Sequence, residues 1–357
     1  AAPVYNFEEI TSIRPLWKKI HGAILIILIA AGTLYSLYVR HIYFKEAFTI
    51  THIILDYMNE FSIIAITFTV LFKSSFLNEE DWCKLNSNLQ HIDKILNNKD
   101  IKEKNVFNNV YIHLSLFLLT YICGVIYSLY TWISEIGTQA FTGYGVHELC
   151  YLYDVILHFL IYNIAMALAY RYKDMNKLFQ TEGNNYLNKK YLITLRKIGA
   201  LSQELIETVE LFNKIFGWPL ILIAGKSVIQ LLTCLNFLTN KLKNTNETFE
   251  QNLFIENLVI AIQTLVSVSL VMIWCDNVTA ESTKTVSTCY KLQQLFPTQS
   301  EARLELFKLA QQVDANVAII TASNFFQINK ATLCGVFGTT TTYFIVILQF
   351  NQNLTND

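Results

Sequence analysis

The chain has 357 residues, of which 53% are hydrophobic and only 15% are charged. Soluble globular proteins usually carry about 25% charged residues, so this composition excludes an ordinary soluble domain. The formal net charge of −1 also excludes a generally basic nucleic-acid binder, and no nucleic-acid partner is expected.

The hydrophobic residues fall into seven blocks separated by polar segments. Each block has about twenty residues, the length that a helix needs to cross a hydrocarbon core about 30 Å thick. No polar segment is long enough to fold around a separate core, so we expect an all-α membrane protein with one seven-span membrane domain over residues 1–357. The predicted spans cover residues 21–39, 50–72, 109–132, 149–170, 217–237, 254–275 and 331–350.

Three of the connections contain apolar residues at the spacing of an amphipathic helix. We expect these stretches to form helical extensions that leave the membrane and pack together, and the alternative is helices lying flat on the lipid surface. The apolar residues are Trp82, Leu85, Leu89, Ile92 and Ile95 after the second span, Leu195, Ile198, Leu201, Leu205, Val209 and Phe212 after the fourth, and Leu304, Leu306, Phe307, Leu309, Val313 and Val317 after the sixth.

Basic residues gather on one side of the predicted spans. Residues 73–104 include six Lys and residues 171–214 include eight Lys or Arg, whereas the connection after the third span and the C-terminal tail have none. Because Lys and Arg are enriched in cytoplasmic loops, we predict a cytosolic N-terminus and an extracellular C-terminus. This orientation argues against a G-protein-coupled receptor and leaves a channel, a transporter or a membrane enzyme.

Catalytic and metal-binding motifs are missing from the sequence. It has no HExxH, GxSxG or Walker A motif, and its seven His and seven Cys are scattered, with no CxxC pair. We therefore expect neither an enzyme nor a bound cofactor or metal, and we expect the cysteines to be reduced.

Polar side chains within the spans are informative, because each is costly in a bilayer and tends to face a cavity or a partner. Acids, amides and aromatic rings gather in the predicted outer half, where they suit a hydroxyl-rich ligand. The alternative is a set of buried polar ties between helices, in which Lys226 neutralises one of the acids. The candidate ligand-binding residues are Asp56, Glu60, Tyr127, Tyr130, Trp132, Asp154, His158, Lys226, Gln230 and Gln263.

The last span has a different composition, with four consecutive Thr followed by an apolar turn. On a helix, Thr339, Thr342, Val346 and Phe350 fall on one stripe. Such a stripe could line a pore that is polar below and closed by apolar rings above. The alternative is that the Thr residues pack against neighbouring helices.

A motif in this span resembles a known signature. Thr342-Tyr343, five apolar residues and Gln349-Phe350 resemble the TY-five-apolar-QF signature that ends the last span of insect gustatory receptors. The placement seven residues from the end of the chain and the inverted seven-span topology are also similar to that family.

This resemblance implies a ligand-gated, nonselective channel for monovalent and divalent cations. It would be a homotetramer in the plasma membrane of sensory neurons. Residues 1–275 would mainly supply ligand-binding helices and cytosolic extensions, and residues 276–357 the anchor and the pore-lining span. Gln349 and Phe350 would stand at the outer gate, with Val346 one turn below.

The acid- and amide-rich outer half favours a sugar such as fructose as the ligand of this channel. One alternative is an olfactory-type channel with an apolar ligand. The other is a secondary transporter, which would have broken helices and an internal repeat near the midplane. The sequence shows neither, although Gly217-Trp218-Pro219 near the inner end of the fifth span could be a break.

Overall fold

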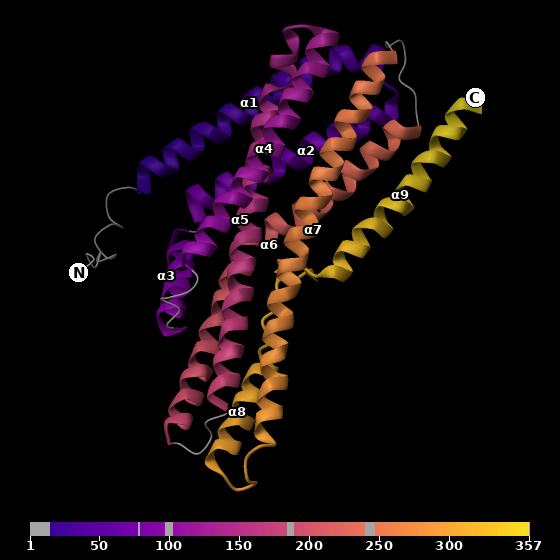
Figure 1. Cartoon of the computed structure of the whole chain (residues 1–357). Coiled ribbons are helices and arrows are strands. Elements are labelled where there is room, and N and C mark those ends of the chain that lie inside the picture. The colour runs from indigo at the N-terminus through magenta and orange to yellow at the C-terminus, as the bar shows by residue number, and fades with distance from the viewer. Residues whose placement is uncertain (1–14, 78, 97–102, 184–188, 240–246, 357) are drawn as a thin grey trace.

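The computed structural model describes residues 15–77, 79–96, 103–183, 189–239 and 247–356, and nearly all of them are helical (Figure 1). The helices are α1 (Pro15–Ala47), α2 (Ile50–Phe72), α3 (Glu79–Leu96), α4 (Glu103–Ile136), α5 (Gln139–Gly183), α6 (Lys189–Thr239), α7 (Glu247–Gln293), α8 (Glu301–Ala315) and α9 (Lys330–Asn356). A π-helical turn, η2 (Lys73–Leu77), continues α2, and the strands β1 (Thr321–Ala322) and β2 (Phe326–Gln327) form a hairpin before α9.

Within these ranges, seven helices are long and apolar enough to cross a membrane. Each predicted span falls on one of them, so the seven-helix membrane fold is confirmed. We call the end of the molecule that holds the α1–α2 and α4–α5 connections the upper end, and the opposite end, which holds α8, the lower end (Figure 1).

Three of the helices are far longer than a bilayer requires. Helices α5, α6 and α7 have 45, 51 and 47 residues. At about 1.5 Å per residue each is about 70 Å long, more than twice the thickness of a hydrocarbon core. Their lower halves therefore extend beyond the apolar layer, where α8 packs beside them (Figure 1).

The lower bundle is held by the apolar stripes that the sequence predicted. Leu85, Ile92, Leu201, Phe212 and Leu309 are all buried and belong to one hydrophobic core that also includes residues of α5 and α7. These helices pack together instead of lying separately on a surface, as expected. The prediction that Leu304 and Phe307 belong to the buried stripe of α8 is wrong, because they are 53% and 39% exposed. The buried face of α8 is formed by Leu306, Leu309, Ala310 and Val313.

Helix α6 passes without interruption through Gly217-Trp218-Pro219, where the transporter alternative would place a break. Proline has no N–H, so the carbonyl of Ile215, four residues earlier, loses its partner in the helix. The amine of Lys73 in η2 replaces that partner, because its Nζ lies 3.1 Å from Ile215 O and 3.4 Å from Lys214 O. The proline therefore becomes a point of attachment between α2 and α6.

The hairpin that leads into α9 is fastened to the same part of α6. Asn213 donates to Ile319 O at 2.8 Å and accepts from Thr321 N at 3.0 Å. Ser323 and Asn324 turn the hairpin with φ angles of 47° and 63°. Ser323 packs closely on Gly217, where a Cβ atom would lie only 2.7 Å from Ser323 N. The position of α9 thus depends on a close backbone contact at Gly217.

We predict that Gly217→Ala displaces the hairpin and lowers the melting temperature of the purified protein, because the added methyl meets backbone atoms of Ser323. Gly225→Ala in the same helix is the matched control, since a Cβ atom there meets nothing within 4 Å. Replacing Gly by Ala in an open helical position stabilises by about 1 kcal/mol. Equal melting temperatures for the two variants would contradict this account.

Candidate functional site

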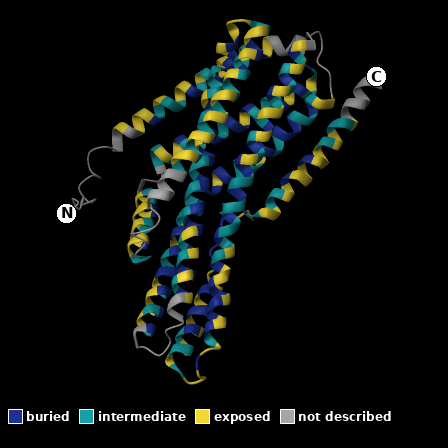
Figure 2. Cartoon of the chain, viewed as in Figure 1, coloured by how far each residue is buried: buried dark blue, intermediate teal, exposed yellow. Residues whose placement is uncertain are grey.

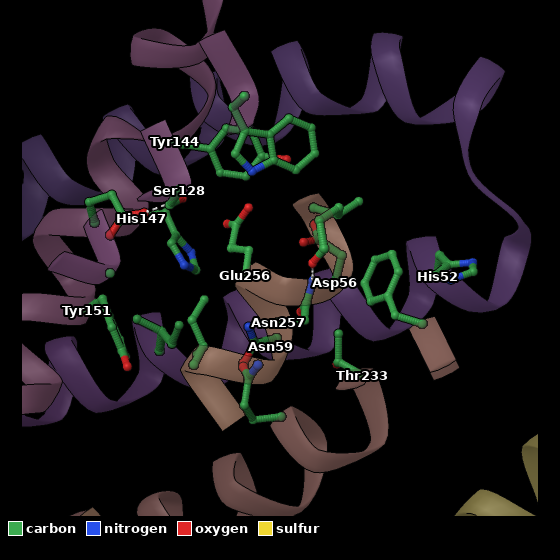
Figure 3. A pocket seen from close by; sticks show the side chains of 18 of the residues that line it. His52, Asp56, Asn59, Ser128, Tyr144, His147, Tyr151, Thr233, Glu256 and Asn257 are labelled. Atoms are coloured by element: carbon green, nitrogen blue, oxygen red, sulfur yellow. Dashed lines mark hydrogen bonds between the residues drawn. The ribbon is translucent and has the colours of Figure 1, made fainter. Parts of the chain in front are cut away.

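A cavity lies among α2, α4, α5, α6 and α7 near the upper end (Figure 3). The space between the lining residues is about 810 Å³, a figure that includes the part open to solvent. Its walls are mostly polar and aromatic. The polar residues and tyrosines that line it are His52, Asp56, Asn59, Ser128, Tyr144, His147, Glu148, Tyr151, Lys226, Gln230, Thr233, Glu256 and Asn257.

One wall of the cavity is organised by a buried arginine of α1. Arg40 is 2% exposed, and its guanidinium lies 3.2 Å from Asp56 Oδ2 and 2.7 Å from Glu60 Oε2. Glu60 also pairs with Nδ1 of His147 at 2.6 Å, and Arg40 Cζ lies 5.1 Å from the centre of the Tyr144 ring. The cluster joins α1, α2 and α5 and satisfies charges that would be costly unpaired in a membrane.

A second wall is aromatic. Trp132 of α4 stacks on Tyr144 of α5 with ring centres 4.2 Å apart, and Phe48 and Phe249 pack around the indole at 6.4 and 5.5 Å. All four rings are buried. The rings fix the end of α4 against α5 and give the cavity a rigid apolar side.

The third wall contains a buried ion pair between α5 and α6. Lys226 Nζ lies 2.5 Å from Asp154 Oδ2, and it also lies 4.7 Å from the centre of the Tyr151 ring. His158 lies on the next turn of α5, with Nδ1 2.8 Å from Asp154 O. Lys226 lines the cavity, whereas Asp154 and His158 lie behind it.

The predicted ligand-binding residues are only partly brought together. Asp56, Trp132, Lys226 and Gln230 line the cavity. The other six do not line it. Glu60, Asp154 and His158 support the walls from behind. Tyr127 donates to Asn252 Oδ1 at 3.4 Å, Gln263 lies against Gly124, and Tyr130 is 62% exposed on the surface of α4.

The predicted stripe on α9 faces away from the rest of the chain. Thr339, Thr342 and Val346 of this stripe are exposed, as is Gln349, whereas Val336 and Thr340 are buried. Helix α9 contacts α6 and α7 but is exposed over much of its length (Figure 2). Thr342 donates to Gly338 O at 3.0 Å, so its hydroxyl does not tie α9 to another helix. Phe350 belongs to α9, but its side chain lies outside the described part of the chain.

Comparisons with known proteins agree with this arrangement. Residues 10–354 match the family described as 7tm chemosensory receptor. The chain belongs to the 7tm chemosensory receptor family. This membership confirms the resemblance to insect gustatory receptors that the sequence suggested. No curated protein sequence matches this receptor.

Two solved structures share its fold. One is the insect olfactory receptor OR5 from Machilis hrabei, with a TM-score of 0.58 and 12% identity over 97% of this receptor and 90% of that chain. The other is the same olfactory receptor in complex with eugenol, with a TM-score of 0.60 and 12% identity over 98% of this receptor and 93% of that chain.

Several lining residues of the receptor were not among the predicted ones. Tyr144, His147 and Glu148 precede residue 149, where the sequence analysis began the fourth span, but α5 already begins at Gln139. Together with Tyr151 they have the spacing of one helix face, which could have been found by continuing the helical period upstream. Arg40 directly follows the predicted first span, which ends at residue 39, whereas α1 continues to Ala47.

We predict that Asp154→Asn lowers the stability of the receptor by about 3–5 kcal/mol, because it leaves the buried amine of Lys226 without its charged partner. The double variant Asp154→Asn/Lys226→Met should recover part of this loss. Asp174→Asn removes the carboxylate of the more exposed Lys177–Asp174 pair and is the control, with an expected effect below about 1 kcal/mol. Thermal unfolding in detergent measures all three, and equal losses in both single variants would contradict the prediction.

Proposed function

We propose that this receptor is a ligand-gated, nonselective cation channel that opens when a sugar such as fructose binds in the cavity. The observation that carries the proposal is the combination of buried, unpartnered polar atoms with aromatic walls in one cavity. His52 Nε2, Asn59 Oδ1 and Gln230 Oε1 are buried without a hydrogen-bond partner among the described residues. A polyhydroxylated ligand would satisfy such atoms, and each one left unsatisfied is costly.

Helix α9 supports the channel part of the proposal. Its stripe of Thr339, Thr342 and Val346 is exposed and mixes hydroxyls with an apolar ring position. One helix per subunit cannot enclose a pore, so the proposal requires several copies around an axis, and we propose a homotetramer. Val346, Gln349 and Phe350 would then form the gate.

We further propose that the upper end faces the outside, as the distribution of basic residues predicts, in the plasma membrane of sensory neurons. The cavity and the C-terminal end of α9 would then both face the space from which a tastant arrives. The lower bundle would lie in the cytosol, where monovalent and divalent cations enter.

A second candidate is an olfactory-type channel for an apolar ligand. It is favoured by the aromatic wall of Phe48, Trp132 and Phe237 and by the eugenol complex of the Machilis hrabei receptor. A secondary transporter is less well supported, because α6 is continuous through Gly217-Trp218-Pro219. Expression of the full chain in oocytes, followed by recording with fructose, other sugars and volatile aromatics, separates these candidates. We expect discrete single-channel current steps with sugars. The absence of current with every sugar would exclude a sugar as the ligand, and saturable flux without discrete current steps would exclude a channel.

We predict that Val346→Ala and Phe350→Ala each increase the current in the absence of ligand, because a smaller apolar side chain weakens a gate that closes by excluding water. Ile345→Ala is the matched control, since this exposed residue lies beside the stripe and not on it. Whole-cell recording at matched surface expression measures the effect. An unchanged basal current in both gate variants would exclude these residues from the gate.

A further inference from the structure

We propose that the ligand of this cavity carries a protonated amine, which Glu256 binds together with the amide oxygens of Gln230 and Asn59. This inference rests on the proposed function, and it narrows the ligand class from sugars in general to polyols that bear an ammonium group, which would bind more tightly than a neutral sugar such as fructose.

The first argument is a surplus of hydrogen-bond acceptors. Glu256 Oε2, Gln230 Oε1 and Asn59 Oδ1 are buried and have no hydrogen-bond partner in the described part of the chain. Glu256 and Gln230 are only 7% and 1% exposed. All three residues line the cavity, from α7, α6 and α2, and Glu256 points toward its middle (Figure 3). An ammonium group has three donors and no acceptor, so it suits a cavity whose lining has an excess of acceptors.

The second argument is the balance of charge around the cavity. The lining has three carboxylates, Asp56, Glu148 and Glu256, but only one basic side chain that is always charged, Lys226. Lys226 is held by Asp154 behind the wall, and Arg40 is shared between Asp56 and Glu60.

Two carboxylates therefore remain without a basic partner. Glu148 accepts a hydrogen bond from Ser128 Oγ at 3.0 Å, and neither Glu148 nor Glu256 forms an ion pair with any residue that the structure describes. Buried carboxylates without a cation are unfavourable, so a cationic ligand gains more there than a neutral one.

A protonated amine fits these observations better than the other candidates. No group of three or more His, Cys, Asp or Glu in the described chain could hold a metal ion. The hydroxyls of a neutral sugar could satisfy the acceptors, but they would leave both carboxylates uncompensated. His52, Thr233 and Asn257 remain available in the lining for the hydroxyls of an amino polyol.

The test is a binding measurement on the full chain in lipid nanodiscs, with pairs of probes that differ in one group. D-glucamine is compared with sorbitol and D-glucosamine with D-glucose, using ligand-induced shifts in melting temperature over a concentration series. We expect each amine to bind about 10- to 100-fold more tightly than its neutral counterpart, the usual range for hydrogen bonds to charged groups. Amines that bind no more tightly than their counterparts would overturn the inference.

Two controls keep the test decisive. Glu256→Gln should abolish the preference for amines, whereas Glu250→Gln, which removes a carboxylate from the same helix outside the lining, should retain it. If Glu256→Gln does not fold, the ligand can be changed instead, because N-acetyl-D-glucosamine has lost the charge and should bind to the wild-type chain no better than D-glucose. A preference that survives both changes would contradict the inference.

The amine-binding inference and the channel proposal can fail independently of each other. Amine binding that depends on Glu256 but produces no current would refute the channel and retain the inference. Currents evoked by neutral sugars, with no preference for amines in binding, would retain the channel and refute the inference.

Discussion

A charge inside a lipid bilayer is stable only if the protein supplies its partner, and the upper half of this receptor is arranged around that requirement. Arg40 is almost completely buried and is shared between Asp56 and Glu60, while His147 completes the cluster on Glu60. Because these residues come from α1, α2 and α5, the positions of three helices depend on one guanidinium. The pairing leaves Asp56 on the cavity surface and places Glu60 behind it.

Helix α6 connects the cavity to α9. Helix α6 provides Lys226 and Gln230 to the cavity, and about three to five turns below it provides Gly217 and Asn213 to the hairpin that precedes α9. Lys73 fastens the end of α2 to the carbonyl that Pro219 leaves free. In the proposed function, a ligand that binds differently to two positions of α6 would therefore also change the position of α9.

Hydrophobic length and helical periodicity were sufficient to predict the seven spans and the buried stripes of the lower bundle. They could not place the start of α5, because Tyr144, His147 and Glu148 are polar enough to look like part of a connection. They also could not separate residues that line a cavity from those that support it. Glu60 and Asp154 are acids within helices, as Asp56 and Glu256 are, yet the first two support the walls and the last two line the cavity.

Exposed positions on single helices were similarly ambiguous in the sequence. Tyr130 and Trp132 are two residues apart on α4, yet Trp132 is 4% exposed and Tyr130 is 62% exposed. The difference arises because only the Trp132 side of α4 meets α5 and the ring of Tyr144. The Thr stripe of α9 could be assigned to neither a pore nor helix packing from composition. In the structure Thr339, Thr342 and Val346 are exposed, but so are Phe337, Tyr343 and Ile345 on other sides of the same helix, so the role of the stripe stays a proposal.

The most direct test of the account is a cryo-electron microscopy map of the full chain in lipid nanodiscs, recorded with and without ligand. We predict four copies around a central axis, with Thr339, Thr342 and Val346 of each copy facing that axis and ligand density beside Glu256 and Gln230. A monomer, or an oligomer in which this stripe of α9 faces lipid, would contradict it.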